Sequence, residues 1–492
     1  MSTTIRGSEK LPSLPAGPRG LLIDGKFVDA ADGATMHVYN PATGEAQAEV
    51  AVGGKEDVDR AVKSARRAFE GAWRQATPSS RGKILWRVAD LIEQHAEELA
   101  LIETLDNGKP LAESRGDHAF AAECFRYYAG SATKIDGRHV VPSLPGEWHT
   151  YTRREPLGVV GQIVPWNFPL MLAAWKIAPA LATGNTIVLK PAEQTPLSTL
   201  RLGELFLEAG LPAGVLNIVN GYGEVAGEAI AAHGGIDKVA FTGSAQTGRA
   251  ILRAAAGNLK KVSLELGGKS PNVVFADADL TAAAQGSAAA IFSHMGEVCI
   301  AGSRLYVEQN VFDEVVGEIA EEAKHLKIGA GTDPDTRLGP LVSESHLDRV
   351  TGYIEEGVAS GARPLTGGKR FGDRGYFVEP TVLVDVEPDS RVVREEIFGP
   401  VLVARPFKDP AELAFEANNT RYGLAAGVWT RDLSKAHRVA AAMQAGMVFI
   451  NTYGAIDPAL PFGGFKESGW GRELGPEALD QYTEAKTVVV AL

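Results

Sequence analysis

The chain has 492 residues, of which 45% are hydrophobic and 22% charged, and its formal net charge is −12. This composition is typical of a globular protein large enough for two or three domains. The acidic balance argues against binding to nucleic acid or anionic membranes, because contacts to phosphates need clustered cations. Two cysteines cannot build a disulfide framework, so we expect a reducing compartment, the cytoplasm.

The N-terminal part of the chain is expected to be a flexible leader followed by helices. Residues 1–10 contain no apolar segment and do not resemble a signal peptide. Hydrophobic residues at helical spacing predict that residues 54–134 are mostly helical. Residues 159–182 are apolar enough to resemble a membrane span, but their prolines and polar side chains are incompatible with one. We instead expect a buried loop that presents Trp166 and Asn167.

From residue 159 onward, short β-branched runs alternate with helical runs. Strands are expected at residues 186–189, 215–219, 238–242 and 262–266, and helices at residues 197–209, 224–233 and 247–256. This alternation predicts an α/β fold with a doubly wound parallel sheet, in which ligands bind at the carboxyl ends of the strands. Residues 271–462 alternate in the same way and predict a second α/β unit, with strands near residues 272–275, 304–307 and 401–407.

Two strand-like segments flank these units, at residues 139–154 and 485–492. An apolar strand at a free end of the chain exposes an unpaired edge. We therefore expect this C-terminal strand to pair with a neighbouring subunit.

Cys299 is the best nucleophile candidate in the chain. A helix is expected over residues 281–294 with Gly296 as its stop, so that Cys299 lies on a glycine-flanked connection before the next strand. Glu265 interrupts an otherwise apolar predicted strand, and a thiol with a desolvated carboxylate is the minimum for covalent catalysis with a general base. Cys124, within a helical run, is expected to be an inert packing residue.

Two glycine clusters, residues 221–227 and 243–248, follow predicted strands. Neither is a G-x-G-x-x-G fingerprint, and ordinary turns explain them equally well. Both nonetheless lie at strand-to-helix turns, where backbone N–H groups favour a phosphate. Lys190 and Glu193 follow another strand, where a carboxylate can accept hydrogen bonds from a ribose, although plain surface charge fits as well.

Other chemistries lack their sequence signatures. The run Gly267-Gly-Lys-Ser270 is not a P-loop, because Ser263 stands where the first glycine belongs. The chain has no G-x-S-x-G elbow and no histidine or cysteine spacing suited to a metal ion, so no metal is expected.

Taken together, these segments resemble the aldehyde dehydrogenase superfamily, from about Leu22 to the C-terminus. Seven motifs occur in the family's order: Pro165-Trp-Asn-Phe-Pro169, Lys190-Pro-Ala-Glu193, Phe241-Thr-Gly-Ser244, Glu265-Leu-Gly-Gly-Lys269, Gly296-Glu-Val-Cys299, Glu396-Ile-Phe-Gly-Pro400 and Pro461-Phe-Gly-Gly-Phe-Lys466. The resemblance implies a nicotinamide-cofactor domain, a catalytic domain and a small β oligomerisation flap. We assign these to residues 1–134 with 155–264, to 265–470, and to 135–154 with 471–492, in a homotetramer or homodimer.

The resemblance also implies the role of each site residue. Cys299 attacks the aldehyde carbonyl, Asn167 and the Cys299 backbone N–H hold the oxyanion, and Glu265 activates the water that hydrolyses the thioester. The implied cofactor-binding residues are Ile163, Trp166, Lys190, Glu193, Gly223, Gly243, Ser244, Glu396 and Phe398. The cofactor is expected to be NAD rather than NADP, because Glu193 would repel a 2′-phosphate.

The implied substrate-lining residues are apolar: Phe168, Leu172, Trp175, Phe292, Val298, Ile300, Ile456 and Phe462. They favour an apolar or aromatic aldehyde such as phenylacetaldehyde, and Ser293 leaves room for a ring. A betaine-type or semialdehyde substrate is the alternative, since Trp175 and Phe462 can contact a quaternary ammonium. A coenzyme-A-acylating enzyme and a scaffold without activity are the remaining alternatives, and the presence of Glu265 with Cys299 and Asn167 argues against both.

The chain departs from the family beside the nucleophile. His294 and Glu297 stand where the family commonly has Asn and Gln. An anionic Glu297 would raise the pKa of the thiol, unless its side chain points elsewhere.

Overall fold

The computed structural model describes residues 17 and 19–492, so the expected N-terminal leader lies outside the described residues. Within them the first sheet has eight strands in the order β18-β10-β9-β6-β7-β8-β1-β2. In chain order these are Leu21–Ile23 (β1), Lys26–Val28 (β2), Val159–Ile163 (β6), Thr186–Lys190 (β7), Leu216–Ile218 (β8), Lys238–Thr242 (β9), Lys261–Glu265 (β10) and Gly469–Trp470 (β18). The central strands from β10 to β8 run parallel, as predicted.

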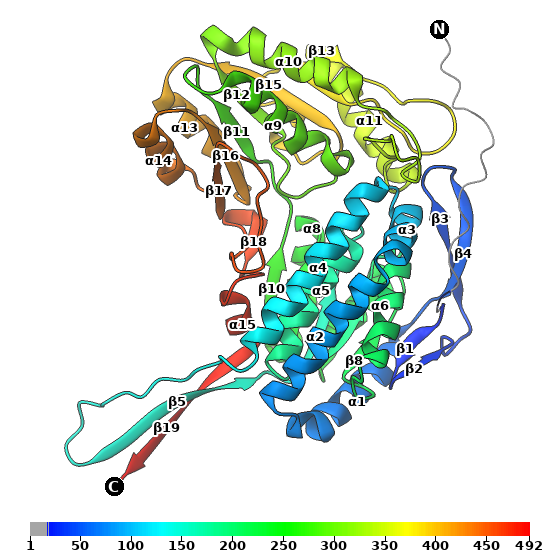
Figure 1. Cartoon of the computed structure of the whole chain (residues 1–492), viewed down its shortest axis with the longest axis vertical. Coiled ribbons are helices and arrows are strands. Elements are labelled where there is room, and N and C mark those ends of the chain that lie inside the picture. The colour runs from blue at the N-terminus through cyan, green and yellow to red at the C-terminus, as the bar shows by residue number, and fades with distance from the viewer. Residues whose placement is uncertain (1–16, 18) are drawn as a thin grey trace.

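Helices cover both faces of this sheet because its strand residues alternate between two cores. Val188 of β7 packs in one apolar core, whereas its neighbours Ile187 and Leu189 pack in the other. The first core contains Lys55–Glu70 (α1), Glu228–Ala232 (α7) and Ala245–Ala255 (α8). The second contains Pro78–Gln94 (α2), Ala96–Asn107 (α3), Leu111–Ser131 (α4), Pro169–Ala182 (α5) and Leu197–Glu208 (α6), the helical layer in the centre of Figure 1. The doubly wound arrangement is thus confirmed.

The second sheet has seven strands in the same described range, in the order β13-β14-β15-β12-β11-β16-β17. They are Pro271–Val274 (β11), Arg304–Glu308 (β12), Arg363–Thr366 (β13), Thr381–Val384 (β14), Val401–Phe407 (β15), Ala425–Trp429 (β16) and Met447–Ile450 (β17). Only β13 is antiparallel to its neighbour. The helices of this unit are Leu280–Phe292 (α9), Phe312–His325 (α10), Glu344–Ala359 (α11), Arg391–Arg394 (α12), Pro410–Asn418 (α13) and Leu433–Ala442 (α14).

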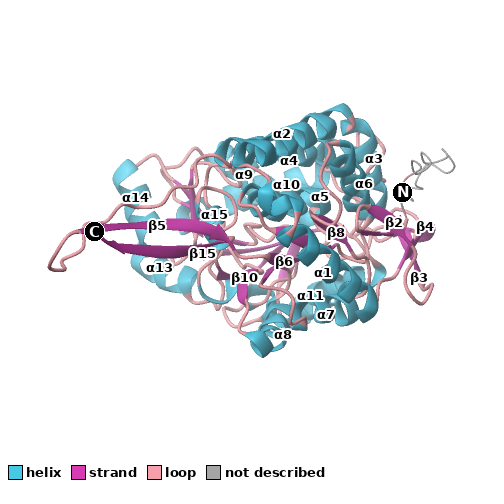
Figure 2. Ribbon diagram, turned by 90° about the horizontal axis from the view of Figure 1, so that it is seen from below, coloured by secondary structure: helices cyan, strands magenta, loops and turns pink. Residues whose placement is uncertain are grey.

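Two further pairs of strands lie outside these sheets. Strands Thr35–Asn40 (β3) and Glu45–Ala51 (β4) form a hairpin, and Trp148–Pro156 (β5) pairs antiparallel with Thr483–Ala491 (β19), which follows the short helix Glu477–Gln481 (α15). Figures 1 and 2 show β5 and β19 as an arm that projects from the body. Strand β5 therefore covers one edge of β19, and pairing of the C-terminal strand with a neighbouring subunit stays a prediction.

Residues 159–182 also differ from expectation. They form β6 and α5, and only residues 164–168 between them are a loop. Pro169 begins the helix, where a missing N–H is harmless, so its presence does not require a loop. No helix in the described part of the chain combines the length and the apolar character that a membrane crossing requires.

Candidate active site

The first sheet brings most of the predicted cofactor residues to one edge. The parallel strands β6 to β10 all end there, at Ile163 (β6), Lys190 (β7), Ile218 (β8), Thr242 (β9) and Glu265 (β10). Trp166 and Asn167 lie on the loop after β6, and Gly243 with Ser244 directly follows β9. This is the edge at which doubly wound folds bind their ligands.

The second sheet contributes the nucleophile from the opposite side. Cys299 and Glu396 lie on connections that lead into β12 and β15, and the segment after Glu265 leads into β11. A Cβ at Gly268 would lie 2.5 Å from the Cys299 carbonyl oxygen, and one at Gly267 would lie 2.0 Å from Glu396 Oε2. Glycine is therefore required at position 268, where the close atom belongs to the backbone, whereas a side chain at position 267 would displace the Glu396 carboxyl group. The candidate site lies where the carboxyl edge of one sheet meets the amino edge of the other.

The turn before Cys299 is not the helix stop that the sequence predicted. Helix α9 ends at Phe292, two residues early, and the backbone then takes left-handed φ angles at His294 (51°), Met295 (53°) and Gly296 (70°). A Cβ at Gly296 would lie 2.2 Å from the Gly399 carbonyl oxygen, so this glycine is needed for close approach rather than for ending the helix.

The two cysteines differ as expected in exposure. Cys124 of α4 is fully buried, whereas Cys299 is partly exposed, and both are free thiols. Burial, together with the charges of Glu396 and Glu265, raises the pKa of the Cys299 thiol to about 12. The expectation that Glu297 would do this is not supported. Its side chain accepts a hydrogen bond from the Val342 N–H at 3.1 Å, and burial raises its own pKa, which favours the uncharged form.

Glu265 is a buried carboxyl group whose two oxygens have no hydrogen-bond partner among the described residues. Burial, and next the charge of Glu473, raises its pKa well above the usual value. Sequence reasoning missed Glu473 and its ion-pair partner Lys176, which also donates to Thr242 Oγ1 at 2.7 Å. The sequence does signal that Lys176 is unusual, because it is a charged residue in the otherwise apolar helix α5. Glu473 gives no such signal, because it is 297 residues away from Lys176 in the sequence.

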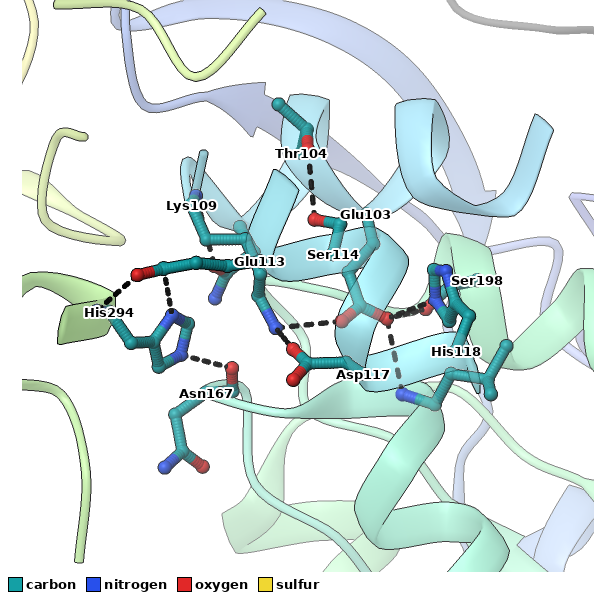
Figure 3. A network of polar contacts seen from close by, with 12 residues as sticks. Glu103, Thr104, Lys109, Glu113, Ser114, Asp117, His118, Asn167, Ser198 and His294 are labelled. Atoms are coloured by element: carbon teal, nitrogen blue, oxygen red, sulfur yellow. Dashed lines mark hydrogen bonds and ion pairs between the residues drawn. The ribbon is translucent and has the colours of Figure 1, made fainter. Parts of the chain in front are cut away.

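Asn167 makes one hydrogen bond through its side chain and one through its backbone. Its side-chain Nδ2 donates to the Glu297 backbone carbonyl at 2.8 Å, and the Asn167 backbone carbonyl accepts a hydrogen bond from His294 Nε2. Figure 3 shows His294 between Asn167 and Glu113 of α4. The predicted oxyanion donor is thus connected to the turn that leads to Cys299.

A cluster of buried charges lies behind this contact and was also missed. Lys109 donates to Glu103 and Asp117 at 2.7 Å each, and His118 Nε2 lies 3.2 Å from Glu103 (Figure 3). We call these four residues the Lys109 cluster. The Lys109 ammonium group lies 4.8 Å from the Phe168 ring centroid, so the cluster contacts one of the predicted substrate-lining residues.

The residues predicted to bind the adenosine part of a cofactor lie on the connections that follow β7, β8 and β9. Lys190 Nζ is buried, 3.2 Å from Glu193 Oε2, and burial lowers its pKa. Gly223 begins a π-helical turn after β8, and Ser244 begins α8 by accepting a hydrogen bond from the Thr247 N–H at 3.1 Å. Ribose hydroxyls and phosphates suit a carboxylate and helix starts placed in this way.

Two of the remaining predicted cofactor residues, Trp166 and Phe398, form an aromatic pair. The rings of Trp166 and Phe398 meet edge to face with centroids 5.3 Å apart, and His346 donates to the Phe398 carbonyl at 2.7 Å. Phe398 has a left-handed φ of 65°. Glu396 accepts from the Gly268 N–H at 2.9 Å, and burial raises its pKa to about 7.

Seven of the eight predicted substrate-lining side chains share one apolar cluster with Cys299: Phe168, Leu172, Trp175, Val298, Ile300, Ile456 and Phe462. Trp175 and Phe462 meet edge to face, with ring centroids 5.0 Å apart. Phe292 belongs to a second apolar cluster, in the second α/β unit, and Val298 packs against both clusters. No cluster of metal-ligating side chains occurs in residues 17 and 19–492.

Comparison with known proteins identifies the family. Residues 27–488 match the model of the aldehyde dehydrogenase family. The chain belongs to this family. It is 51% identical to the putative aldehyde dehydrogenase DhaS of Bacillus subtilis (strain 168), over 100% of this chain and 99% of the relative. It is 48% identical to a phenylacetaldehyde dehydrogenase of Pseudomonas fluorescens, over 100% of both chains.

Solved aldehyde dehydrogenase structures have the same fold. The NAD⁺ complex of an aldehyde dehydrogenase from Bacillus cereus superimposes with a TM-score of 0.95 at 50% identity, covering 96% of this chain and 97% of the other. A betaine aldehyde dehydrogenase from Staphylococcus aureus, in complex with NAD⁺, gives a TM-score of 0.94 at 41% identity, covering 96% and 94%. The predicted fold class and the expectation of an aldehyde dehydrogenase are confirmed.

Proposed function

We propose that this aldehyde dehydrogenase oxidises apolar or aromatic aldehydes, with phenylacetaldehyde as the favoured substrate, and uses NAD. The observation that carries the proposal is that the predicted substrate-lining side chains are apolar and that seven of them share an apolar core cluster with Cys299. Aromatic and branched side chains gain roughly 25 cal/mol for each Å² of apolar surface that they bury, whereas a charged substrate group would lose its hydration there. The phenylacetaldehyde dehydrogenase of Pseudomonas fluorescens, 48% identical over the whole chain, supports the choice.

The site residues suit an acyl-enzyme mechanism. The Cys299 thiol releases its proton to solvent as its sulfur attacks the aldehyde carbon, and the Asn167 amide with the Cys299 N–H stabilises the negative oxygen. NAD, when bound, would supply the acceptor for the hydride of the substrate carbon. Glu265 then takes a proton from the water that hydrolyses the thioester. Its raised pKa and lack of hydrogen bonds within the described residues suit a group that exchanges protons.

The residues around the expected cofactor site fit NAD. Glu193, with Lys190 beside it, would accept hydrogen bonds from the adenosine ribose, and the turns at Gly223 and Ser244 would hold the diphosphate. Glu396, fixed by the Gly268 N–H, would bind the second ribose. The Bacillus cereus complex supports this assignment, because that protein binds NAD⁺ on the same fold.

We further propose that the β5–β19 arm joins subunits into a dimer or tetramer, with residues 135–154 and 471–492 as its contacts. The arm exposes apolar side chains at Val141, Leu144, Val489, Val490 and Leu492. Ending the chain before β19 is expected to leave monomers, and the molar mass from light scattering would show this. An unchanged mass would refute the assignment.

The substrate proposal is tested with a panel of aldehydes, each assayed with NAD and with NADP. We expect kcat/KM to rise from acetaldehyde through hexanal to phenylacetaldehyde, and to be low for succinic semialdehyde. Betaine aldehyde is the critical competitor, because the Trp175–Phe462 pair can bind a quaternary ammonium. A higher kcat/KM for betaine aldehyde or the semialdehyde would refute the proposed apolar preference.

A further inference from the structure

Two hydrogen bonds connect Asn167 to the turn that precedes the nucleophile. The Asn167 side chain donates to the Glu297 backbone carbonyl. The Asn167 backbone carbonyl accepts a hydrogen bond from His294 Nε2 (Figure 3). A carbonyl oxygen has no proton to give, so Nε2 must carry the hydrogen. Cys299 lies two residues after Glu297. The position of Asn167 relative to the thiol therefore depends on this turn.

Helix α4 and the loop before α5 hold His294 itself. The Glu113 carboxylate accepts from the His294 backbone N–H at 3.0 Å through Oε1, and its Oε2 lies 3.7 Å from His294 Nδ1. The imidazole also lies against Phe168, with ring centroids 4.3 Å apart. The side chain is thus enclosed by Glu113 and Phe168, with its far nitrogen directed at Asn167.

The backbone of His294 indicates that this position is imposed by its surroundings. A left-handed φ of 51° costs a non-glycine residue about 1–3 kcal/mol, and it persists only where neighbouring contacts hold it. Met295, next in the chain, shares the conformation. Such strain concentrates at functional sites, which makes the contact of His294 with Asn167 the feature to explain.

A purely structural role does not account for this side chain. In the Lys109 cluster nearby, the Lys109 ammonium has two carboxylate partners at 2.7 Å. His294 Nδ1 and Glu113 Oε2 instead face each other at 3.7 Å, too far apart for a hydrogen bond, and neither has one from another described residue. Unsatisfied buried groups of this kind lower the stability of the fold. The hydrogen bond that the imidazole does make goes to Asn167.

We propose that His294 is a positioning residue whose Nε2–H holds the Asn167 backbone so that the Asn167 amide faces the oxyanion formed at Cys299. The inference rests on the proposed function, which gives Asn167 that role. An asparagine in place of His294 would extend its amide only to about the Nδ1 position, whereas the bond to Asn167 needs a donor at Nε2. The hydrogen bond to the Asn167 backbone therefore depends on the histidine that this chain has at position 294.

The test compares His294→Leu with His294→Gln in the full-length enzyme. Glutamine can place a donor near the Nε2 position, whereas leucine fills similar space and donates nothing. We expect His294→Leu to lower kcat by ~10²-fold, as a displacement of about 1 Å typically does, with little change in KM for NAD. His294→Gln is expected to restore most of the rate. Unchanged kcat in His294→Leu, or equal losses in both variants, would overturn the inference.

A double-substitution cycle separates positioning from general packing. Asn167→Ala removes the donor that His294 is inferred to hold. If His294 acts through Asn167, then adding His294→Leu to Asn167→Ala lowers kcat no further, whereas independent effects multiply. Losses that multiply would contradict the inference.

Crystal structures of the variants keep this inference distinguishable from the proposed function. In His294→Leu we expect the Asn167 amide to have left the Glu297 carbonyl, and in His294→Gln to have kept it. An unmoved Asn167 in His294→Leu refutes the positioning role whatever the activity. If Asn167 moves as expected but the parent enzyme oxidises no aldehyde, the proposed function fails and the positioning of Asn167 by His294 stands.

Discussion

Glu103 and Glu265 are both buried carboxyl groups, but their surroundings are opposite. Glu103 of α3 accepts hydrogen bonds from Lys109, His118, Ser198 and the Leu170 N–H. Burial alone would raise the pKa of Glu103, yet the charges of Lys109 and His118 outweigh it and hold the pKa below the usual range. Glu265 lacks any such partner in the described chain, and its pKa is raised.

This difference separates a charge that holds the fold together from one that is free for chemistry. Glu103 cannot take up a proton without weakening several hydrogen bonds. Glu265 can gain or lose a proton without breaking one, as a general base must do in every turnover. Variants at the two positions, and at the groups around them, test whether Glu103 mainly affects stability and Glu265 mainly affects activity.

The largest expected effect concerns the two cysteines. Like the two carboxyl groups, they comprise one residue that packs in the core, Cys124, and one that is proposed to react, Cys299. Cys299→Ala is expected to abolish aldehyde oxidation, because no other described thiol reaches the site. Cys124→Ser, buried in the helical layer, is the control and should leave turnover nearly intact. The formation of NADH from phenylacetaldehyde measures both. Comparable activity in Cys299→Ala and the parent would refute the covalent mechanism.

The next effect is a crossed pair of substitutions at the carboxyl groups. Glu265→Gln is expected to slow steady turnover by ~10²-fold or more, while a first burst of NADH remains, because deacylation loses its base. Glu103→Gln is expected to lower the free energy of unfolding by about 3–5 kcal/mol, since it breaks a buried ion pair. Steady-state kinetics and urea unfolding measure the two effects.

The pH dependence of the free energy of unfolding tests the difference between Glu103 and Glu265 independently of activity. The folded-state pKa of Glu103 is lowered, so its contribution is present above the unfolded pKa and is lost as the pH falls through the folded one. The folded-state pKa of Glu265 is raised, so ionisation at high pH opposes folding, and Glu265→Gln removes this penalty. The comparison of the two sites fails if Glu265→Gln destabilises the fold as much as Glu103→Gln.

A third prediction concerns the reactivity of the free thiol. With a pKa of about 12, alkylation of Cys299 by iodoacetamide should accelerate roughly tenfold per pH unit from pH 7 to 10, without a plateau. Glu396→Gln is expected to speed alkylation by lowering this pKa, but only above pH 7, where Glu396 itself is ionised. Mass spectrometry distinguishes Cys299 from Cys124. A plateau near pH 8.5 would show that the thiol is unperturbed.

The fold could be predicted from the sequence wherever a local pattern determines the structure. Strands β9 and β15 occupy the predicted residues, because β-branched runs between turns have few other conformations. The end of α9 could not be predicted, since the left-handed angles at His294 and Met295 depend on contacts with distant segments. The pairing of β19 with β5 joins segments more than 300 residues apart, so no local signal specifies it.

The site divides in the same way. Cys299 and Glu265 could be singled out because each is anomalous within its own segment, one as a rare thiol and the other as an acid on an apolar strand. Their partners could not. Glu473 and Glu113 are ordinary surface-type residues in the sequence, and only the fold brings them beside Glu265 and His294.

Lys190 and Glu193 are an intermediate case between the two buried carboxyl groups, and they give the smallest expected effect. The Glu193 side chain is 32% exposed and only 3.2 Å from a buried ammonium group, so solvent and Lys190 both screen its charge. Two unit charges 4 Å apart in water interact by about 1 kcal/mol, and we expect Glu193 to repel a 2′-phosphate by about this amount. That energy corresponds to a change of about fivefold in kcat/KM. Glu193→Gln is expected to raise the NADP-to-NAD ratio of kcat/KM by that factor. Glu208→Gln, an exposed carboxyl group at the end of α6 with no predicted role in binding the cofactor, is the control and should not change it. Equal ratios in the parent and Glu193→Gln would show that this carboxylate does not select the cofactor.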